Sequence, residues 1–320
     1  MEASAGCQVR RYPRVPVQLS QASAARLGLA VSDVGSHHDE CTALAGKRPR
    51  RGDTQMQQPF NWTDPDAYEI FMGRWSELLT QPFLAFAGVP SGGRVLDVAC
   101  GTGALTKAVA DTGAHVIGVD ASEGYLEGAQ RRRSHPNITY ESGDVRQLRF
   151  ADNSFDAAVS TLALDVIPEI EQVVTEMKRV TKPGGVVASG VHQFFGGMPA
   201  FDLVQHTGAV LDAAINEMRT FFKGRPLFWP NGQAGLWRKL GLAEVTEVPI
   251  VVDCEYASFS DYWSTFTSRQ GRFGNVFAAL SDSVRDALEH HVRNGYLVGL
   301  PDRPRSFPMM FRVVRGVVAA

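Results

Sequence analysis

Two acids and two glycines near the middle of the first half of the chain have the types and spacing that bind a nucleoside. Asp97 ends a short apolar run, and Gly101 and Gly103 follow it. A second apolar run, residues 115–120, ends in Asp120, about 17 residues after Gly103. In a strand–turn–helix unit, glycines allow a tight turn beside the ligand, and an acid at the next strand end accepts the ribose hydroxyls.

The turn lacks the features of phosphate-binding nucleotide sites. A dinucleotide-binding turn needs a third small residue three positions after its second glycine, and Thr106 stands there. The Gly-Lys-Ser/Thr ending of nucleotide hydrolase loops is missing as well. What remains suits a ligand with a ribose and an amino acid group but no phosphate, and S-adenosylmethionine fits this description. A nicotinamide-dependent oxidoreductase is the weaker alternative, because of Thr106.

Further motifs follow in order along the chain: 96–103 (Leu-Asp-Val-Ala-Cys-Gly-Thr-Gly), 118–120 (Gly-Val-Asp), 143–144 (Gly-Asp) and 179–185 (Arg-Val-Thr-Lys-Pro-Gly-Gly). Their order is far more specific than any one of them. Together they resemble the class I S-adenosylmethionine-dependent methyltransferases, most closely the type 11 group, which acts largely on small molecules. The resemblance covers roughly residues 68–191.

The resemblance implies a cofactor site at the strand ends. Asp97 is expected near the amino group of the methionine moiety, and Asp120 can accept both ribose hydroxyls. Asp144 is expected near the adenine amine, with the Val145 backbone close to the ring. The predicted cofactor-binding residues are Asp97, Ala99, Gly101, Gly103, Asp120, Ala121, Asp144, Val145 and Thr161.

One residue departs from the family pattern, which often has glycine at the position of Ala99. Alanine tolerates a positive φ poorly. We therefore expect an ordinary backbone conformation at Ala99 and a slightly less close approach of the cofactor.

The order of the elements predicts an α/β fold. After a first helix at 64–88, the patterns predict strands at 94–98, 115–120, 138–142, 155–160 and 185–191 and helices at 104–111, 123–133 and 169–180. This alternation favours a doubly wound parallel sheet. The resemblance implies a Rossmann-like sheet of seven strands whose last strand is antiparallel.

The second half of the chain is rich in aromatic residues. It predicts helices near 202–219, 232–240 and 258–293 and strands at 243–254 and 309–318. The aromatic segments are expected to be insertions that form an apolar lid over the carboxyl end of the sheet. We therefore expect a methyltransferase domain at 56–320, with a cofactor half at 64–191 and substrate or lid insertions at 192–308.

The composition limits the partners and the cellular compartment that we expect for the protein. Residues 1–55 carry arginine clusters without an apolar period and predict a disordered or non-native extension. The formal net charge of −2 gives no footprint for nucleic acid, and no apolar run is long enough to span a bilayer. Four scattered cysteines predict no metal site and favour a reducing, cytoplasmic setting.

The predicted function is transfer of the methyl group of S-adenosylmethionine to a small, partly apolar acceptor. The sulfonium supplies the leaving group, so the protein mainly aligns the reactants and excludes water. A base is needed only if the acceptor must lose a proton, and Asp165, His192 and Asp261 are candidates without a decisive signal. A regulatory protein that binds S-adenosylmethionine without transferring methyl remains an alternative.

The first predicted helix carries residues that resemble those folding over the cofactor in similar enzymes. Tyr68 and Trp75 offer aromatic faces, and Trp75 is alternatively a core residue. Arg74 is expected either to pair with the methionine carboxylate or to lie on a solvated helix face.

Overall fold

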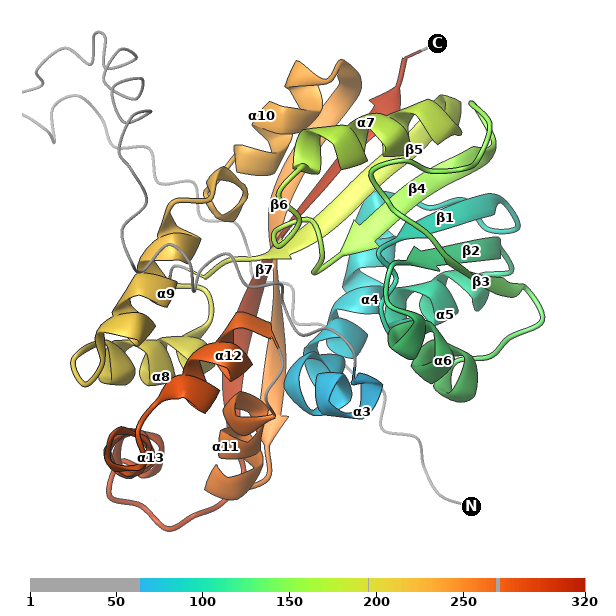
Figure 1. Cartoon of the computed structure of the whole chain (residues 1–320). Coiled ribbons are helices and arrows are strands. Elements are labelled where there is room, and N and C mark those ends of the chain that lie inside the picture. The colour runs from blue at the N-terminus through green and yellow to red at the C-terminus, as the bar shows by residue number, and fades with distance from the viewer. Residues whose placement is uncertain (1–63, 195, 269–270, 320) are drawn as a thin grey trace, which may run out of the picture. The chain divides into compact units, whose positions relative to one another are not determined.

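A seven-stranded sheet lies at the centre of the computed structural model, which describes residues 64–194, 196–268 and 271–319 (Figure 1). The strand order is β3-β2-β1-β4-β5-β7-β6. The strands are β1 (Arg94–Val98), β2 (His115–Asp120), β3 (Ile138–Ser142), β4 (Phe155–Thr161), β5 (Thr181–His192), β6 (Leu242–Tyr256) and β7 (Arg305–Val318). The extension predicted at residues 1–55 lies outside the described residues.

Strands β1 to β5 pair in parallel, whereas β7 is antiparallel to both β5 and β6. The sequence-based prediction of an α/β sheet of seven strands with an antiparallel last strand is therefore confirmed. The first three strands have the predicted bounds, and the later ones are longer than predicted at one or both ends.

Both faces of the sheet are buried, and successive strand residues alternate between two hydrophobic clusters. In β4, for example, Ala157 belongs to one cluster and Ala158 to the other. One face packs against α4 (Arg74–Ala87) and α5 (Ala104–Ala110), and the other against α7 (Ile170–Val180) and α10 (Gly232–Lys239). Helix α6 (Glu123–Arg132) contacts β2 and β3. Burial on two faces is typical of parallel sheets and explains why their strands read as continuous apolar runs.

The predicted first helix is continuous but changes its winding. Asp64 caps α3 (Pro65–Tyr68) by accepting hydrogen bonds from the backbone of Asp66 and Ala67, and the helix ends at Gly88 in a left-handed conformation. Between α3 and α4 lies a π-helical turn, η1 (Glu69–Gly73), which the sequence pattern did not predict. Such turns are rare and occur frequently beside functional sites.

The helical segments predicted at 202–219 and 258–293 are helical, but each is divided into shorter helices. The segment 202–219 belongs to α8 (Pro199–Ala209) and α9 (Ala213–Lys223), and Asp212 caps the second helix through Ala214 N. The segment 258–293 contains α11 (Phe259–Thr267), α12 (Gly271–Ala279) and the start of α13 (Asp282–Leu297), which Ser281 caps. Side chains that bond the first free backbone N–H groups start a new helix.

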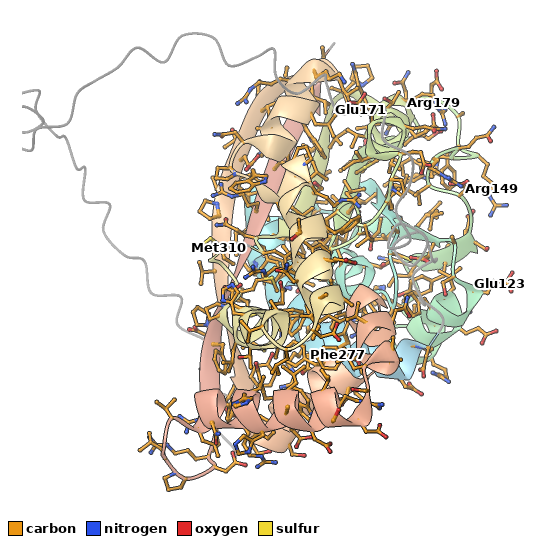
Figure 2. The ribbon with its side chains drawn as sticks, turned by 60° about the vertical axis from the view of Figure 1, so that its left-hand side comes forward. Glu123, Arg149, Glu171, Arg179, Phe277 and Met310 are labelled. Carbon is orange, nitrogen blue, oxygen red and sulfur yellow. The ribbon has the colours of Figure 1, made fainter. Side chains whose placement is uncertain are left out.

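These helices gather around the ends of β6 and β7 that lie away from α10, whereas the short 3-10 turn η2 (Pro226–Phe228) lies between α9 and α10 and contacts both (Figure 1). Aromatic rings of these helices and of η2, together with Phe194 after β5, contact one another in a buried cluster, the aromatic cluster, made of Phe194, Phe201, Phe222, Phe228, Phe266 and Phe273. Phe277 also lies buried among these helices, whereas Glu123 and Arg149 lie at the edge of the molecule in Figure 2. No helix in the described ranges is long and apolar enough to cross a membrane.

Candidate active site

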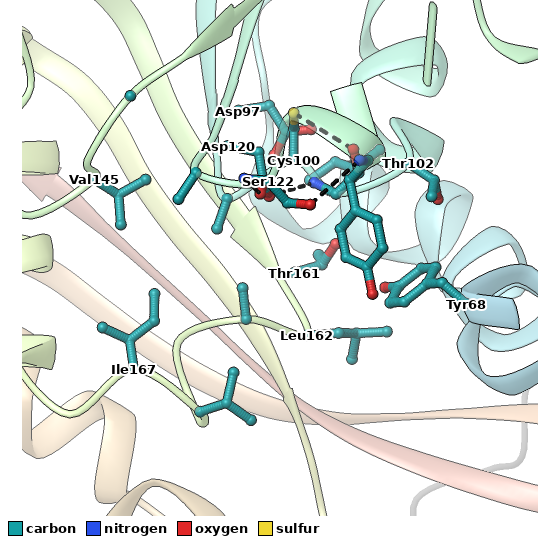
Figure 3. Close-up of a pocket in the computed structure, with 18 of the residues that line it drawn as sticks. Tyr68, Asp97, Cys100, Thr102, Asp120, Ser122, Val145, Thr161, Leu162 and Ile167 are labelled. Carbon is teal, nitrogen blue, oxygen red and sulfur yellow. Dashed lines mark hydrogen bonds between the residues drawn. The ribbon is translucent and has the colours of Figure 1, made fainter. Parts of the chain in front are cut away.

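A cavity of about 980 Å³ opens at the carboxyl ends of β1, β2, β3 and β4. This volume is near the upper end of the range for ligand cavities. Figure 3 shows acidic Asp97 and Asp120 at one end and apolar Leu162 and Ile167 across the cavity from them. The predicted cofactor residues that line it are Asp97, Ala99, Gly101, Asp120, Ala121, Asp144, Val145 and Thr161.

The turn after β1 is built from residues with positive φ. Gly101 and Gly103 have φ values of 55° and 85°, as glycines in such a turn allow. Gly103 is not among the lining residues of the cavity; it precedes α5, and a Cβ there would meet the ring of Tyr140. Gly103 thus serves the entry into the helix rather than a close approach to the cavity.

The ordinary backbone conformation expected at Ala99 is wrong, because its φ is 56°. The chain must leave β1 and reverse into the glycine turn while Cys100 N donates a hydrogen bond to Val119 O. The left-handed conformation costs a residue with a Cβ roughly 1–2 kcal/mol. The neighbouring strands therefore hold Ala99 in a strained conformation at the wall of the cavity.

Asp120 is held by two backbone N–H groups. Its Oδ2 accepts a hydrogen bond from Gly101 N at 2.8 Å, and its Oδ1 accepts one from Ser122 N at 2.8 Å. Burial raises the pKa of Asp120, and these two hydrogen bonds oppose that rise. Each carboxylate oxygen keeps a further lone pair, so the side chain can accept two hydroxyls from a ligand in the cavity.

Asp97 lies deeper, with 1% of its surface exposed. Its Oδ2 accepts a hydrogen bond from Thr106 Oγ1 at 2.6 Å. Burial, and the negative charge of Asp120 nearby, raise the pKa of Asp97 to about 7 against the opposing hydrogen bond from Thr106. A cation such as an ammonium group would favour the ionised form of this carboxyl. Thr106, which argued against a dinucleotide site, thus orients one of the acids.

Asp144 has a different environment from the other two acids. Its carboxylate is half exposed and forms an ion pair with Arg146 Nη2 at 2.8 Å. The hydrogen bonds from Arg146 lower the pKa of Asp144. The carboxylate therefore stays ionised and oriented at the cavity rim, beside Val145.

Sequence reasoning missed several residues of the site. Tyr125 lines the cavity, and its ring lies 5.0 Å from that of Tyr68. Arg133 donates hydrogen bonds to Glu69 and to Thr102 O, so it ties the π-helical turn to the glycine loop. Arg133 belongs to a run of three arginines at the end of α6, and nothing in the sequence indicated its distant acidic partner.

Three candidates from the sequence do not line the cavity: Arg74, Asp261 and Trp75. Arg74 Nη2 forms an ion pair with Asp261 Oδ1 at 2.6 Å, and the guanidinium also bonds Glu255 O. Both carboxylate oxygens of Asp261 accept hydrogen bonds from the Arg74 guanidinium, and neither residue lines the cavity. This ion pair argues against Arg74 as a partner of the methionine carboxylate and against Asp261 as a base. Trp75 is fully buried, and its Nε1 donates a hydrogen bond to Cys254 Sγ. Its interpretation as a core residue is therefore confirmed.

The other two candidate bases lie together. His192 ends β5 and Asp165 lies in the loop after β4, and His192 Nδ1 is 2.9 Å from Asp165 Oδ2. Both side chains are buried. Nothing in the described ranges groups three or more His, Cys, Asp or Glu side chains that could hold a metal ion.

Comparison with known proteins agrees with this arrangement. A family model described as a methyltransferase domain matches residues 96–189, the segment that carries the glycine turn and all three acids. This segment is a class I S-adenosylmethionine-dependent methyltransferase domain. The cofactor of this family is S-adenosylmethionine.

Two bacterial relatives are demethylmenaquinone methyltransferases. That of Renibacterium salmoninarum is 46% identical over 125 residues, which are 38% of this chain and 50% of the relative. That of Paenarthrobacter aurescens is 40% identical over 121 residues, which are 37% and 46% of the two chains. The chain thus spans about half the length of the curated relatives it matches.

Solved structures support the fold. Phosphoethanolamine N-methyltransferase 2 of Haemonchus contortus, in complex with phosphomonomethylethanolamine and S-adenosylhomocysteine, has a TM-score of 0.51 and 19% identity. The match covers 80% of this chain and 57% of that one. At this identity the likeness establishes the fold alone.

Proposed function

We propose that the protein transfers the methyl group of S-adenosylmethionine to a small, partly apolar acceptor. The observation that carries this proposal is the cavity itself, with Asp97 and Asp120 at one end and Leu162, Val166 and Ile167 at the other. The acidic end suits the amino and ribose groups of the cofactor, and the apolar end suits an acceptor. The cavity has room for both molecules side by side.

We assign the cofactor by the geometry of the acids. Asp120 accepts the two ribose hydroxyls through its free lone pairs, and Asp97 faces the ammonium group. Asp144 and Val145, at the rim, flank the adenine. The protein aligns the acceptor, the methyl carbon and the sulfur, and the cavity walls exclude water from the reacting atoms.

We propose a quinol ring of the demethylmenaquinone type as the acceptor class. Its support is twofold: the names of the relatives, and the aromatic cluster beside the cavity. A quinone is electron-poor, so only its reduced, dihydroxy form is a nucleophile. The aromatic-rich helices lie outside the matched segment 96–189. For that reason the acceptor needs a direct test.

The test is incubation of the full chain with S-adenosylmethionine and a short-chain demethylmenaquinone, reduced and kept without oxygen. Mass spectrometry should find S-adenosylhomocysteine and the acceptor with one added methyl group in equal amounts. Cofactor binding without transfer to this acceptor or to a library of phenols, amines and thiols would favour the regulatory alternative instead.

A further inference from the structure

The buried pair of Asp165 and His192 contains two polar atoms that form no hydrogen bond with the described residues. His192 Nδ1 lies 2.9 Å from Asp165 Oδ2. His192 Nε2 and Asp165 Oδ1 are also buried, and neither has a hydrogen-bond partner among the described residues. A pair that only stabilised the fold would be expected to have its buried atoms satisfied, since an unsatisfied polar atom costs stability.

The contact between the two residues selects a tautomer of the histidine. An ionised Asp165 can only accept a hydrogen bond, so the neutral imidazole carries its proton on Nδ1. The Arg225 guanidinium and the Tyr68 hydroxyl lie close enough to Asp165 to interact with it electrostatically. His192 Nε2 is then a free lone pair and can accept a proton.

The pair lies at a small apolar cavity that adjoins the cofactor cavity. This second cavity, of about 50 Å³, is lined by both residues of the pair and by Phe194, Phe201, Phe222 and other apolar side chains. Tyr68, Leu162 and Val166 line both cavities. The rings of Phe194 and Phe311 lie 5.1 and 5.7 Å from the His192 ring and limit its movement.

We infer that His192 is the general base of the methyl transfer and that Asp165 is its positioning residue. The inference rests on the proposed function and names the acceptor's chemistry more closely: an apolar planar ring with an ionisable hydroxyl. A cavity of this size takes the hydroxyl-bearing edge of such a ring, while the rest lies toward Ile167 in the larger cavity.

The chemical step balances without a further reactant. The acceptor's hydroxyl proton moves to His192 Nε2, and the electron pair of the resulting anion, on its oxygen or conjugated ring carbon, forms the bond to the methyl carbon. The pair of the breaking bond between sulfur and methyl remains on sulfur, which gives neutral S-adenosylhomocysteine. For attack by carbon, the ring proton then returns to the oxygen. The proton on His192 passes to solvent, so each turnover releases one proton.

The direct test reads the ionisation of a bound probe and needs no turnover. The probe is 4-nitro-1-naphthol, whose colour differs between its neutral and ionised forms, added to the full chain saturated with S-adenosylhomocysteine. At a pH where the free probe is mainly neutral, the wild type should bind it mainly as the anion. His192→Gln should bind it in the neutral form. Asp165→Asn, which removes the partner that keeps the proton on Nδ1, should bind less of the anion than the wild type. The exposed His206→Gln is the matched control and should behave as the wild type.

Kinetics with reduced demethylmenaquinone and with ring-halogenated, more acidic phenols give a second readout. His192→Gln should lower kcat roughly 100-fold and Asp165→Asn at least about 10-fold. The loss should shrink as the acceptor becomes more acidic, since an ionised acceptor needs no base. A structural role would lower kcat equally for all acceptors.

Three results would overturn the inference: a neutral probe in the wild type, no probe binding, or an equal anion fraction in the wild type and His192→Gln. The folding of His192→Gln is judged by circular dichroism and by its affinity for S-adenosylhomocysteine. If this variant does not fold, the comparison of the bound anion fraction in the wild type and in Asp165→Asn tests the inference instead. Failure of the proposed function is distinct, because it would show as absent methyl transfer by the wild type.

Discussion

Replacing Asp120 with alanine should weaken the binding of S-adenosylhomocysteine roughly 100-fold. Both carboxylate oxygens already accept a backbone N–H, from Gly101 and Ser122, so the side chain is oriented before the ligand arrives. One lone pair on each oxygen remains for one ribose hydroxyl. Hydrogen bonds to a charged group contribute about 1.5–3 kcal/mol each, so two contribute at least about 3 kcal/mol. Since about 1.4 kcal/mol corresponds to a factor of ten, the expected loss is about 100-fold.

The assay must separate the ligand's contacts from those that hold the loop. Titration calorimetry with the full chain should compare S-adenosylhomocysteine with an analogue that lacks both ribose hydroxyls. Asp120→Ala should lose affinity for the first ligand much more than for the second. Asp111→Ala, an exposed acid paired with Lys107, is the matched control and should bind both ligands as the wild type.

Two results would refute this reasoning. If the affinity of Asp120→Ala for S-adenosylhomocysteine is within twofold of that of the wild type, Asp120 does not contact the ribose. Equal losses for both ligands would show that Asp120 acts only by holding the glycine turn. A thermal melt of the variant must accompany the titration, because the loss of two backbone contacts also lowers the free energy of unfolding.

Three further outcomes follow from the same site. Ala99→Gly should raise the free energy of unfolding in urea melts by roughly 0.5–1 kcal/mol, because glycine adopts a φ of 56° without the strain that a Cβ causes. Ala104→Gly, in helix α5, is the control and should lower the free energy of unfolding by about 1 kcal/mol. In the ligand-free protein the pKa of Asp97 is about 7 when folded and 3.8 ordinarily, so between about pH 4 and 7 this group binds more protons in the folded state. It should therefore lower the free energy of unfolding by a few kcal/mol as pH rises through this range. Asp97→Asn should remove most of this fall, and the remainder belongs to Asp120, whose pKa burial also raises. Arg133→Gln should lower the free energy of unfolding by about 2 kcal/mol and weaken cofactor binding. Arg149→Gln, at an exposed ion pair, is the control and should change the stability and the affinity little. Equal effects of the two substitutions would contradict a role of the ion pair between Arg133 and Glu69.

The cofactor half could be predicted from the sequence because its signals are local. A buried parallel strand is an apolar run, a tight turn needs glycine, and a strand-end acid such as Asp120 is visible in the chain itself. The bounds of β1, β2 and β3 were therefore predicted correctly. The backbone conformation of Ala99 was not predicted correctly, because its φ is determined by the positions of β1 and β2 and not by the conformational preference of alanine.

The contacts of the aromatic-rich helices could not be predicted in the same way. Aromatic residues indicated burial, but the helix breaks near Asp212 and Ser281 depend on single capping side chains inside longer apolar patterns. Asp165 and His192 were separate candidates, and only the parallel pairing of β4 with β5 brings them into contact. Likewise, only the packing of α4 against β6 and the placement of α11 could show that Asp261 is bound to Arg74.

The central claim is that the turn after β1 holds an adenosyl sulfonium and not a pyrophosphate. Titration calorimetry of the full chain with S-adenosylhomocysteine and, separately, with NADH tests this claim most directly. We predict one saturable site for S-adenosylhomocysteine, lost with Asp120→Ala, and no heat of binding for NADH. Saturable binding of NADH, with none of S-adenosylhomocysteine, would contradict the account.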